Sequence, residues 1–430
     1  MIDYKNLAAF LDSSPVNFWA VETVCGHLKE GGFIELDMRD PWNLVPGGKY
    51  YVKKNDSAVF AFIAGDGPAD SPFKIISAHS DSPSFRVKPN CEIVCDGNIV
   101  KLNTEVYGGA ILSTWFDRPL SLAGRVILRG DDPLNPESRL IRISRPILTI
   151  PNLAIHFNRA VNDGVALSKQ KDMLPVLGRV ENKEQAKGLV RQLVAKELGV
   201  EAERIVDYDL SIYDTTPACL VGLNDEFITS GRIDDLSMVH AALNAMLNTV
   251  DTKDSATRVI AIFDNEETGS GTKQGAASPI LDYILRRINF SKKGTEEDYL
   301  RAVAKSFMIS ADDAHGIHPN YPEKHDPTNH PTLGGGPVVK INANCKYMTD
   351  ADSSAVFALL CEKAGVPCQF FVNHSDSPGG STLGNILTSQ IPMRGVDVGN
   401  AIWAMHSARE TASIKDHNEM IAAMTEFFLA

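Results

Sequence analysis

The chain has 430 residues, of which 43% are hydrophobic and 22% are charged, and its formal net charge is −12. This length exceeds the ~250–300 residues at which a single core stops growing, so we expect two domains or one large domain with an insertion. The ordinary globular composition excludes a disordered chain, and the negative charge argues against nucleic acid or an anionic membrane as the main partner.

The N-terminal stretch MIDYKNLAAFLDSSP carries acids where a signal peptide has basic residues, and no later segment has ~18 consecutive apolar residues. We therefore expect a cytoplasmic protein. Seven cysteines occur without paired C-x-x-C groups, which predicts reduced, mostly buried thiols. Cys91 and Cys95 lie in an alternating apolar and polar stretch, which is typical of a strand rather than of a metal site.

The first ~90 residues show two helical patterns followed by strand patterns. We predict helices over 4–12 and 17–31 and strands around 48–53 and 58–63. The apolar run FKIISAHSD at 73–81 ends in polar residues, which indicates a buried strand that presents side chains at its C-terminal end.

The pattern changes between ~90 and ~220 to short alternating runs with one amphipathic helix at 184–198, which predicts an inserted β-rich region. After ~230, apolar strands alternate with helices. The strands are expected at 258–263, 306–310 and 369–372, and the helices at 236–250, 277–289, 352–364 and about 410–428. The fold class is therefore α/β with a central sheet, in which residues 1–89 and 220–430 form a discontinuous domain and residues 90–219 form the insertion.

Five polar motifs follow or precede these elements. In AHSD, His79 can face a crevice while Asp81 orients its ring, although a loop histidine beside a capping aspartate fits equally well. RIDDL places Asp234 at a helix entrance, where N-capping is the simpler explanation. In FDNEETGSG, Glu266 and Glu267 follow an apolar strand, where acids are also favoured in a helical first turn.

Of the last two motifs, one is rich in histidine and the other contains a single histidine. ISADDAHGIHPNYPEKHDPTNH at 309–330 holds four of the eleven histidines and includes Asp312. AMHSARE contributes His406 before the final helix, where a structural histidine is the commoner explanation. Taken together, two histidines, three carboxylates and a spare glutamate suit a pair of divalent cations with a shared water. Two Zn²⁺, three carboxylates and one hydroxide would form a neutral buried cluster, which avoids the cost of an unpaired charge.

With these residues in place, the chain resembles the aspartyl aminopeptidase family of dizinc metallo-aminopeptidases, which form tetrahedral dodecamers. The similarity runs nearly end to end through FLDSSPVNFWAVE, SAHSDSPSFRVKP, LAIHFNR, GRIDDL, FDNEETGSGTKQGA, SADDAHGIHPNYPEKH, GPVVKINANCKY, SDSPGGSTLG and AMHSARE. The resemblance implies a zinc-peptidase-type mixed sheet flanked by helices, and an inserted β-rich domain that mediates dimerisation.

The resemblance also implies residue roles. His79 and Asp312 would bind one metal, Glu267 and His406 the other, and Asp234 would bridge both. Glu266 would be the general base that takes a proton from a water bridging the metals, and the resulting hydroxide would attack the substrate, with Asp81 orienting the centre. The bond between Asp234 and Asp235 would be cis. The implied substrate-contacting residues are His156, which reaches a neighbouring subunit's site, His315, Lys340 and Tyr347. A solvent-facing strand lysine is the alternative for Lys340.

The expected function is therefore removal of single N-terminal residues from peptides, with a preference for N-terminal Asp or Glu that Lys340 and His315 would supply. The metals would be Zn²⁺, with Mn²⁺ or Co²⁺ as substitutes, and the partners are peptides with a free N-terminus and further copies of the chain. The alternatives are an aminopeptidase of neutral or apolar preference, a related deacylase or carboxypeptidase, and a non-catalytic assembly protein of the same fold.

Overall fold

The computed structural model describes residues 4–430, which fall into two compact units. The first unit comprises the segments up to Asp81, Ala218–Met405 and Glu410–Ala430, and the second comprises Ser82–Pro217 with His406–Arg409. Among the described residues, no helix has both the length and the apolar composition that crossing a bilayer requires.

The first unit is built on a mixed nine-stranded sheet. Its central strands β13, β4, β14 and β18 run parallel, and antiparallel neighbours flank them on both sides. These central strands are almost wholly buried, as continuous apolar runs predict. In spatial order the strands are β1 (Ile34–Glu35), β2 (Lys49–Lys54), β3 (Ala58–Ile63), β13 (Thr257–Phe263), β4 (Phe73–His79), β14 (Phe307–Ala311), β18 (Arg394–Gly399), β16 (Val338–Ile341) and β17 (Gln369–Val372).

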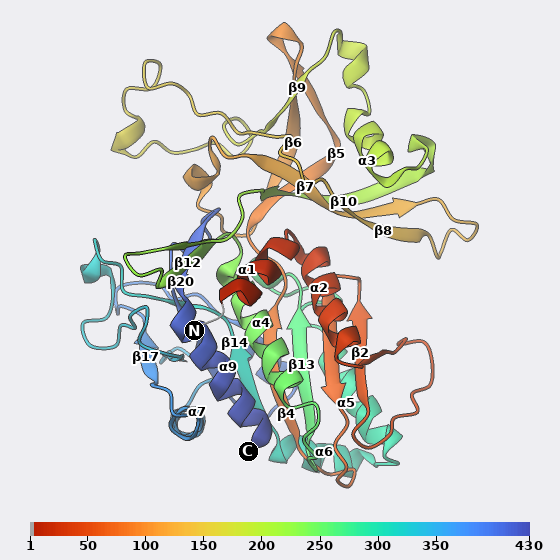
Figure 1. The fold of residues 1–430 in the computed structure, drawn as a ribbon, viewed down its shortest axis with the longest axis vertical. Helices are drawn as coiled ribbons and strands as arrows, with labels where there is room; N and C mark the ends of the chain where they lie inside the picture. The colour runs from red at the N-terminus through yellow and green to blue at the C-terminus, as the bar shows by residue number, and fades with distance from the viewer. Residues whose placement is uncertain (1–3) are drawn as a thin grey trace. The chain divides into compact units, whose positions relative to one another are not determined.

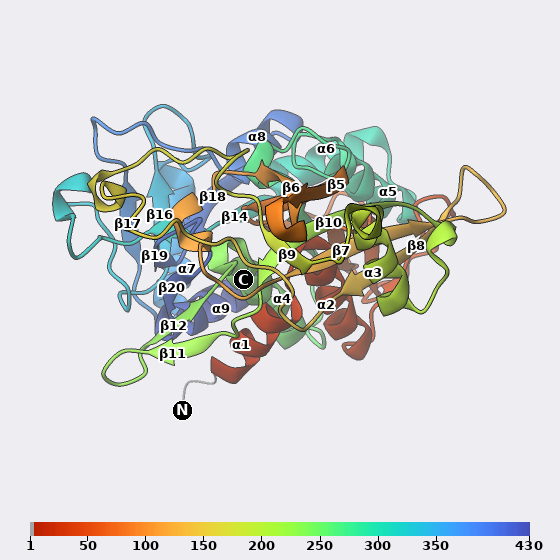
Figure 2. The ribbon, with the colours of Figure 1, turned by 90° about the horizontal axis from the view of Figure 1, so that it is seen from above.

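Helices cover both faces of this sheet, and each face has its own apolar core (Figure 2). One face is covered by α1 (Tyr4–Ser13), α2 (Asn17–Glu30), α4 (Ile233–Asn248), α7 (Ala351–Ala364) and α9 (Ile414–Leu429). The other is covered by α5 (Ile280–Ser291), α6 (Glu296–Lys305) and α8 (Leu383–Gln390). The fold class predicted from the alternating pattern is thus confirmed.

A second, five-stranded sheet belongs to the same unit. Its order is β11 (Cys219–Val221), β12 (Phe227–Ser230), β20 (Glu410–Ser413), β19 (Ala401–Trp403) and β15 (Ala314–His315). The final helix was predicted to begin near residue 410, but residues 410–413 form β20 and the helix begins at Ile414. The Ser413 side chain caps that helix by accepting a hydrogen bond from the Asp416 amide.

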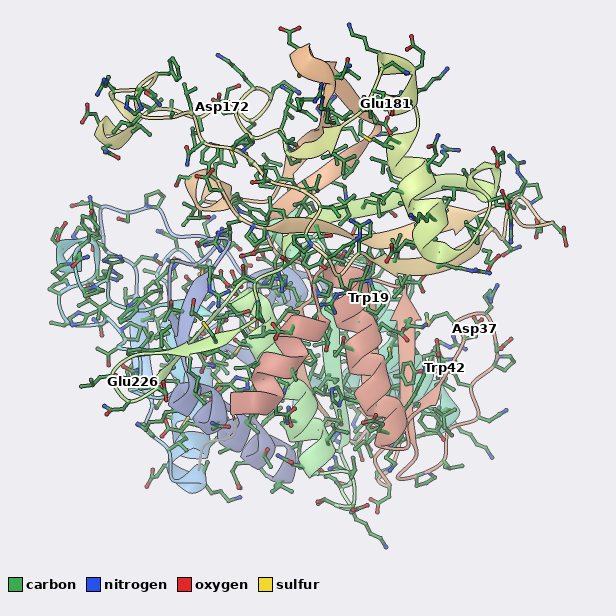
Figure 3. The ribbon with its side chains drawn as sticks, turned by 45° about the horizontal axis from the view of Figure 1, so that its top comes forward. Trp19, Asp37, Trp42, Asp172, Glu181 and Glu226 are labelled. Atoms are coloured by element: carbon green, nitrogen blue, oxygen red, sulfur yellow. The ribbon has the colours of Figure 1, made fainter. Side chains whose placement is uncertain are left out.

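The second unit contains a six-stranded antiparallel sheet, in agreement with the β-rich pattern of the middle of the sequence. Its order is β8 (Glu137–Arg142), β7 (Leu120–Leu128), β10 (Ile205–Asp214), β5 (Ser84–Cys95), β6 (Ile99–Tyr107) and β9 (Val176–Arg179). Helix α3 (Leu189–Leu198) packs on it through Val190 and Val194. Residues 151–175 form a long loop outside the sheet (Figure 1), where Asp172, labelled in Figure 3, accepts a hydrogen bond from the Ser168 amide.

Two helices of the first unit lie outside the helical ranges predicted from the hydrophobic pattern. Helix α6 begins with a capping box in which Thr295 and Asp298 bond each other's backbone amides, so a local signal for it was present. Helix α8 follows SDSPGGST and has only eight residues, too few for a clear period. All seven cysteines are free thiols, and Cys219 and Cys345 are exposed rather than buried. Cys91 and Cys95 do lie on one strand, β5.

Candidate metal centre

Three neighbouring parallel strands of the first unit end at the same edge of the large sheet. Strand β4 ends at His79, which pairs with Phe263, the last residue of β13. On the other side of β4, strand β14 ends at Ala311, and Asp312 follows directly. Because parallel strands present their carboxyl ends together, His79, Asp312 and the segment after Phe263 meet at one place.

The His79 imidazole lies at the centre of this edge and is 1% exposed. Its Nε2 atom is 3.4 Å from Asp234 Oδ1 and 4.0 Å from Asp312 Oδ1. Its Nδ1 atom lies 3.0 Å from the Asp81 carbonyl oxygen and 3.4 Å from the Asp81 carboxylate. An N–H on Nδ1 therefore leaves Nε2 as the atom that faces the neighbouring carboxylates.

Asp234 and Asp235 enter the site from the first turn of α4. Both have non-helical backbone angles, and the bond between them is cis, as the family resemblance implies. Because these two residues are non-helical, the regular turns of α4 begin after them, so both acids stand at a helix entrance as the RIDDL motif predicted. Asp235 Oδ2 accepts a hydrogen bond from the His79 amide at 2.9 Å, which ties the helix start to the end of β4.

Glu266 and Glu267 begin a short 3-10 helix, η6 (Glu266–Thr268), and are half-buried rather than fully solvated. The Asp81 carboxylate accepts the amides of Glu266 at 3.1 Å and Glu267 at 3.2 Å. Asp81 thus supports the site in two ways, because its carbonyl faces the His79 ring and its carboxylate fixes the backbone of the glutamate pair.

Lys340 lies beside Asp312, and the Tyr347 ring lies beside Lys340. Lys340 is 3% exposed, so the solvent-facing alternative for it is wrong. Its Nζ atom is 3.2 Å from Asp312 Oδ2 and 5.6 Å from the centre of the Tyr347 ring. His315 is exposed, and its ring makes an edge-on contact with Phe371 at 5.9 Å. One buried cation with an aromatic ring beside it therefore adjoins the carboxylate cluster.

The two remaining residues implied by the resemblance, His406 and His156, belong to the second unit. His406 lies in the loop between β19 and β20, and its Nδ1 atom is 3.2 Å from the Gly109 carbonyl oxygen. At the end of that loop, Glu410 Oε2 accepts a hydrogen bond from the Asp234 amide at 3.1 Å. His156 is exposed in the long 151–175 loop, so it lies on no strand.

The acids around His79 have strongly shifted pKa values. Burial raises the pKa of Glu266 to about 8, with the Asp312 and Glu267 carboxylates acting in the same direction and His79 opposing them. Burial also raises the pKa of Asp235 well above its usual range, despite the attraction of His79. Such shifts arise where buried carboxylates crowd together with too little positive charge.

The pKa of the His79 imidazole is also raised, by the carboxylates around it. Burial alone would lower the pKa of its imidazole, but the carboxylates of Asp235, Asp234 and Asp81 outweigh burial and raise it well above the ordinary value. The site therefore favours positive charge at the His79 position.

The donor set fits divalent cations. Ligand atoms of His79, Asp234, Asp235 and Asp312 all lie within 4.8 Å of one another, and those of His79, Glu266 and Glu267 form a second such group. Imidazole nitrogen and carboxylate oxygen are donors that zinc accepts. Among the described residues, the buried Asp235 Oδ1 atom has no hydrogen-bond partner, which is consistent with a cluster that lacks positive charge.

Sequence reasoning missed two buried acids that hold the site together. Glu410, 1% exposed, holds the backbone of Asp234, and Asp313, 2% exposed, accepts hydrogen bonds from the Ser237 hydroxyl at 2.7 Å and the Asn400 amide at 3.3 Å. Asp313 was visible in the motif SADDAH as the neighbour of Asp312. Glu410 was likewise visible as the last residue of AMHSARE, but its contact with Asp234, 176 residues away in the chain, was not.

Comparisons with known proteins identify the family to which the chain is similar. A model of the family described as "Aminopeptidase I zinc metalloprotease (M18)" matches residues 10–428. A relative from Clostridium acetobutylicum named "Probable M18 family aminopeptidase 2" is 49% identical over 425 residues, covering 99% of this chain and 98% of its own.

Solved structures match as well. A chain in the cryo-EM structure of the Ape4 and Nbr1 complex superposes with a TM-score of 0.94 at 34% identity, covering 99% of this chain and 85% of that chain. A chain of the S. cerevisiae mApe1 dodecamer has a TM-score of 0.86 at 24% identity, covering 99% of this chain and 96% of its own, and it shows a shared fold.

Proposed function

The chain belongs to the M18 family of zinc metalloprotease aminopeptidases, and on that premise we propose that it removes single N-terminal residues from peptides at a two-metal centre. The observation that carries the proposal is the cluster of His79, Asp234 and Asp312, whose ligand atoms lie within 4.8 Å of one another at the carboxyl edge of the sheet. The proposed ligands are His79, Asp312, Glu267, His406 and, shared by both metals, Asp234.

When bound, two divalent cations would acidify a water, polarise the scissile carbonyl and bind the free amino group of the substrate. The chain would hold this arrangement through contacts behind the ligands. Asp81 fixes the His79 ring and the backbone of Glu267, and Glu410 fixes the backbone of Asp234. These contacts limit how far each ligand atom can move, which is what a preorganised site requires.

Glu266 is the proposed general base. It would take a proton from the attacking water and return it to the nitrogen of the leaving amine. Its half-buried carboxylate, with a pKa raised to about 8 by burial, has a high proton affinity for an acid. Added positive charge would bring this pKa down toward neutrality, where a group can both accept and donate a proton.

The preference for N-terminal Asp or Glu would come from Lys340. Its ammonium group is buried beside Asp312 and the Tyr347 ring, and a buried cation attracts a carboxylate more strongly than an exposed one. The observation that favours a neutral or apolar preference instead is the 3.2 Å pairing of Lys340 with Asp312, which partly satisfies its charge.

The second unit is proposed to mediate dimerisation. His156 lies in a loop with Leu153 at 58%, Ile155 at 48% and Phe157 at 80% exposure, and a histidine flanked by exposed apolar side chains suits a subunit interface. His156 would then stabilise the oxyanion in a neighbouring subunit's site. Dimers would assemble into a dodecamer, which is the assembly named for mApe1. We propose a cytoplasmic location for this assembly.

A panel of aminoacyl substrates tests the proposal, with each substrate in free and N-acetylated form and with Zn²⁺, Mn²⁺ or Co²⁺ supplied. We expect hydrolysis of the free forms and little or none of the acetylated forms, because the amino group is recognised. Preference for the acetylated forms would indicate a deacylase or carboxypeptidase. Inactivity on every substrate with every metal would indicate a non-catalytic assembly protein.

The same panel tests specificity when Lys340 is replaced by methionine, which keeps the length of the side chain and removes its charge. We expect Lys340→Met to raise KM for N-terminal Asp and Glu substrates at least ~10-fold and to change KM for N-terminal Leu little, since a charge-assisted contact contributes about 1.5–3 kcal/mol. Equal effects on acidic and apolar substrates would favour the alternative preference.

A further inference from the structure

A buried aspartate of the large sheet, Asp397, is bonded to two loops next to Lys340. Asp397 is 0% exposed and lies on β18, between β14 and β16. Loop 342–350 joins β16 to α7, and loop 373–382 joins β17 to α8. The first of these loops carries Tyr347, whose ring centre lies 5.6 Å from the Lys340 ammonium group.

Loop 342–350 is bonded to β18 through both residues that follow Tyr347. The Met348 amide donates to Asp397 Oδ2 at 2.6 Å, and the Asp397 amide donates to Thr349 Oγ1 at 2.9 Å. The Met348 side chain lies against Gly395, two residues earlier on β18, where a Cβ atom would overlap its thioether. Hydrogen bonds and packing therefore fix the backbone next to Tyr347 to the sheet.

Loop 373–382 ends at the same carboxylate. The Thr382 hydroxyl donates to Asp397 Oδ1 at 2.6 Å. Thr382 is the N-cap residue of α8, yet its side chain makes no capping hydrogen bond to that helix. A Cβ atom at Gly384 would lie 2.5 Å from Asp397 Oδ2, so glycine is required for the first turn of α8 to come this close. The positive end of the helix dipole therefore adjoins the carboxylate.

The charge of Asp397 is matched by its surroundings. Both carboxylate oxygens accept hydrogen bonds, which suits the ionised form. Val339 of β16 pairs with Val398 of β18, and the antiparallel register continued by one residue places Lys340 opposite Asp397 on the same face of the sheet. Burial raises the pKa of this acid, and the Thr382 hydroxyl and the charge of Lys340 oppose that shift.

From these contacts we propose that Asp397 is a positioning residue, which holds loop 342–350 on β18 and so places the Tyr347 ring beside Lys340 to contact the N-terminal side chain of the substrate. This inference rests on the proposed aminopeptidase function. Asp397 touches neither the substrate nor a metal in this role and acts through Tyr347. Thr382 contributes by fixing the rotation of the carboxylate, so that Oδ2 faces the Met348 amide.

Thr349→Val and Thr382→Val test the proposal in the metal-loaded protein, because each removes one hydroxyl and leaves every charge in place. Asp397→Asn would also remove the charge opposite Lys340. For aminoacyl substrates with a free N-terminal Asp or Leu, we expect each valine variant to raise KM roughly 3- to 10-fold, as the loss of one hydrogen bond does. We expect kcat to change little, because neither hydroxyl is bonded to a proposed metal ligand.

Matched variants show whether the hydroxyl is the cause. Thr349→Ser and Thr382→Ser keep the hydroxyl and should have the wild-type KM. Thr388→Val makes the same change on α8, where the hydroxyl bonds only to the carbonyl groups of Gly384 and Asn385, and it should leave KM unchanged. A valine variant that unfolds more easily but keeps the wild-type KM would show a purely structural role and overturn the proposal.

Tyr347→Ala tests whether the effect passes through Tyr347. In the Tyr347→Ala protein, Thr349→Val and Thr382→Val should raise KM no further, because residues that act as one unit are not additive. A further rise in KM as large as the rise in the wild-type background would overturn the proposal.

The wild-type protein separates this inference from the proposed function. If it hydrolyses the free substrates and the valine variants have the same KM, only the role of Asp397 is overturned. If it hydrolyses none of them with Zn²⁺, Mn²⁺ or Co²⁺, the proposed function and the role of Asp397 are both overturned.

Discussion

Glu266 and Glu267 are neighbours in the chain, yet one is the proposed general base and the other a proposed metal ligand. This difference in role depends on how their backbone is held. The Asp81 carboxylate accepts both of their amides, so the two side chains leave the short helix η6 from a fixed origin. Consecutive residues of a helical turn point in different directions, which allows one carboxylate to bind a metal and the other to reach a water.

Glu266→Gln separates these two roles. We expect kcat to fall by about 10²–10⁴, because the amide cannot accept the proton, while metal content stays at the wild-type level. Steady-state kinetics and elemental analysis measure both quantities. The matched control is Glu297→Gln, an exposed acid on α6, which should leave kcat unchanged. A near-normal kcat in Glu266→Gln would remove Glu266 from the mechanism.

The sequence indicated which residues could be metal ligands, but it did not indicate which hydrogen bonds hold those residues in place. The motifs AHSD, RIDDL and SADDAH each had an ordinary structural explanation, and only the combined set of histidines and carboxylates, together with the family resemblance, pointed to His79, Asp234 and Asp312 as metal ligands. Glu410 could not be predicted as the partner of Asp234, since the contact depends on how distant segments pack. The roles of His406 and His156 remain predictions from the family resemblance.

Helices α4 and α9 are joined by a pair of buried histidines. His240 Nδ1 lies 2.8 Å from His417 Nε2, and their rings stack at 5.0 Å. Burial lowers the pKa of His417 to about 4, and burial with the neighbouring His417 lowers the pKa of His240 well below its usual range. Because α4 carries Asp234 at its start, this pair links the helix of the metal centre to the last helix of the chain.

These shifts predict acid sensitivity. His417 has a folded pKa of about 4 and an ordinary value of 6.5, so the unfolded chain binds a proton before the folded chain does. Its contribution to stability is complete above pH 6.5 and is lost as pH falls from about 6.5 to about 4, by on the order of 3 kcal/mol. We expect His417→Gln to lose less unfolding free energy than the wild type over this range in denaturant titrations.

The test is the difference between His417→Gln and the wild type in the unfolding free energy lost on acidification, because acid also releases metal from both proteins. His374→Gln, which changes a partly exposed loop histidine between β17 and α8, should lose as much stability as the wild type. If His417→Gln and the wild type lose the same unfolding free energy, the pair does not control acid stability.

Elements with strong periodicity were predicted well. The strand at 369–372 matches β17, and the predicted helix at 352–364 differs from α7 by one residue at its start. The short helix α8 and strand β18 were outside the predicted ranges, and Asp397 on β18 bonds to Thr382, the residue before α8. This buried aspartate accepts the Thr382 hydroxyl and the Met348 amide at 2.6 Å each. Such long-range hydrogen bonds leave no periodic trace in the sequence.

At the scale of the whole molecule, the proposed role of His156 requires a neighbouring subunit. We expect His156→Ala to lower kcat by roughly 10²–10³ without changing the mass of the oligomer, as removal of an oxyanion donor does. Light scattering and kinetics measure the two effects. A fall in oligomer mass with the same fall in kcat would indicate an assembly role instead.

Mixed assemblies sharpen this test. Co-expressed Glu266→Gln and His156→Ala chains should regain activity, because a site in a His156→Ala chain keeps Glu266 and receives His156 from its neighbour. Random pairing in a symmetric dimer would complete roughly a quarter of the sites. The double variant Glu266→Gln/His156→Ala, co-expressed with Glu266→Gln, serves as the control and should stay inactive. Activity no greater than the mean of the separate variants would show that His156 does not act between subunits.

The central claim is that two divalent cations at one buried centre carry the activity, and a metal titration tests it most directly. Chelator-treated protein should be inactive, and hydrolysis of an unblocked aminoacyl substrate should rise with added Zn²⁺ until two ions are bound per chain. Asp234→Asn, which alters the shared ligand, should bind less than two ions and stay inactive. Full activity of metal-free protein, or two bound ions in Asp234→Asn, would contradict the account.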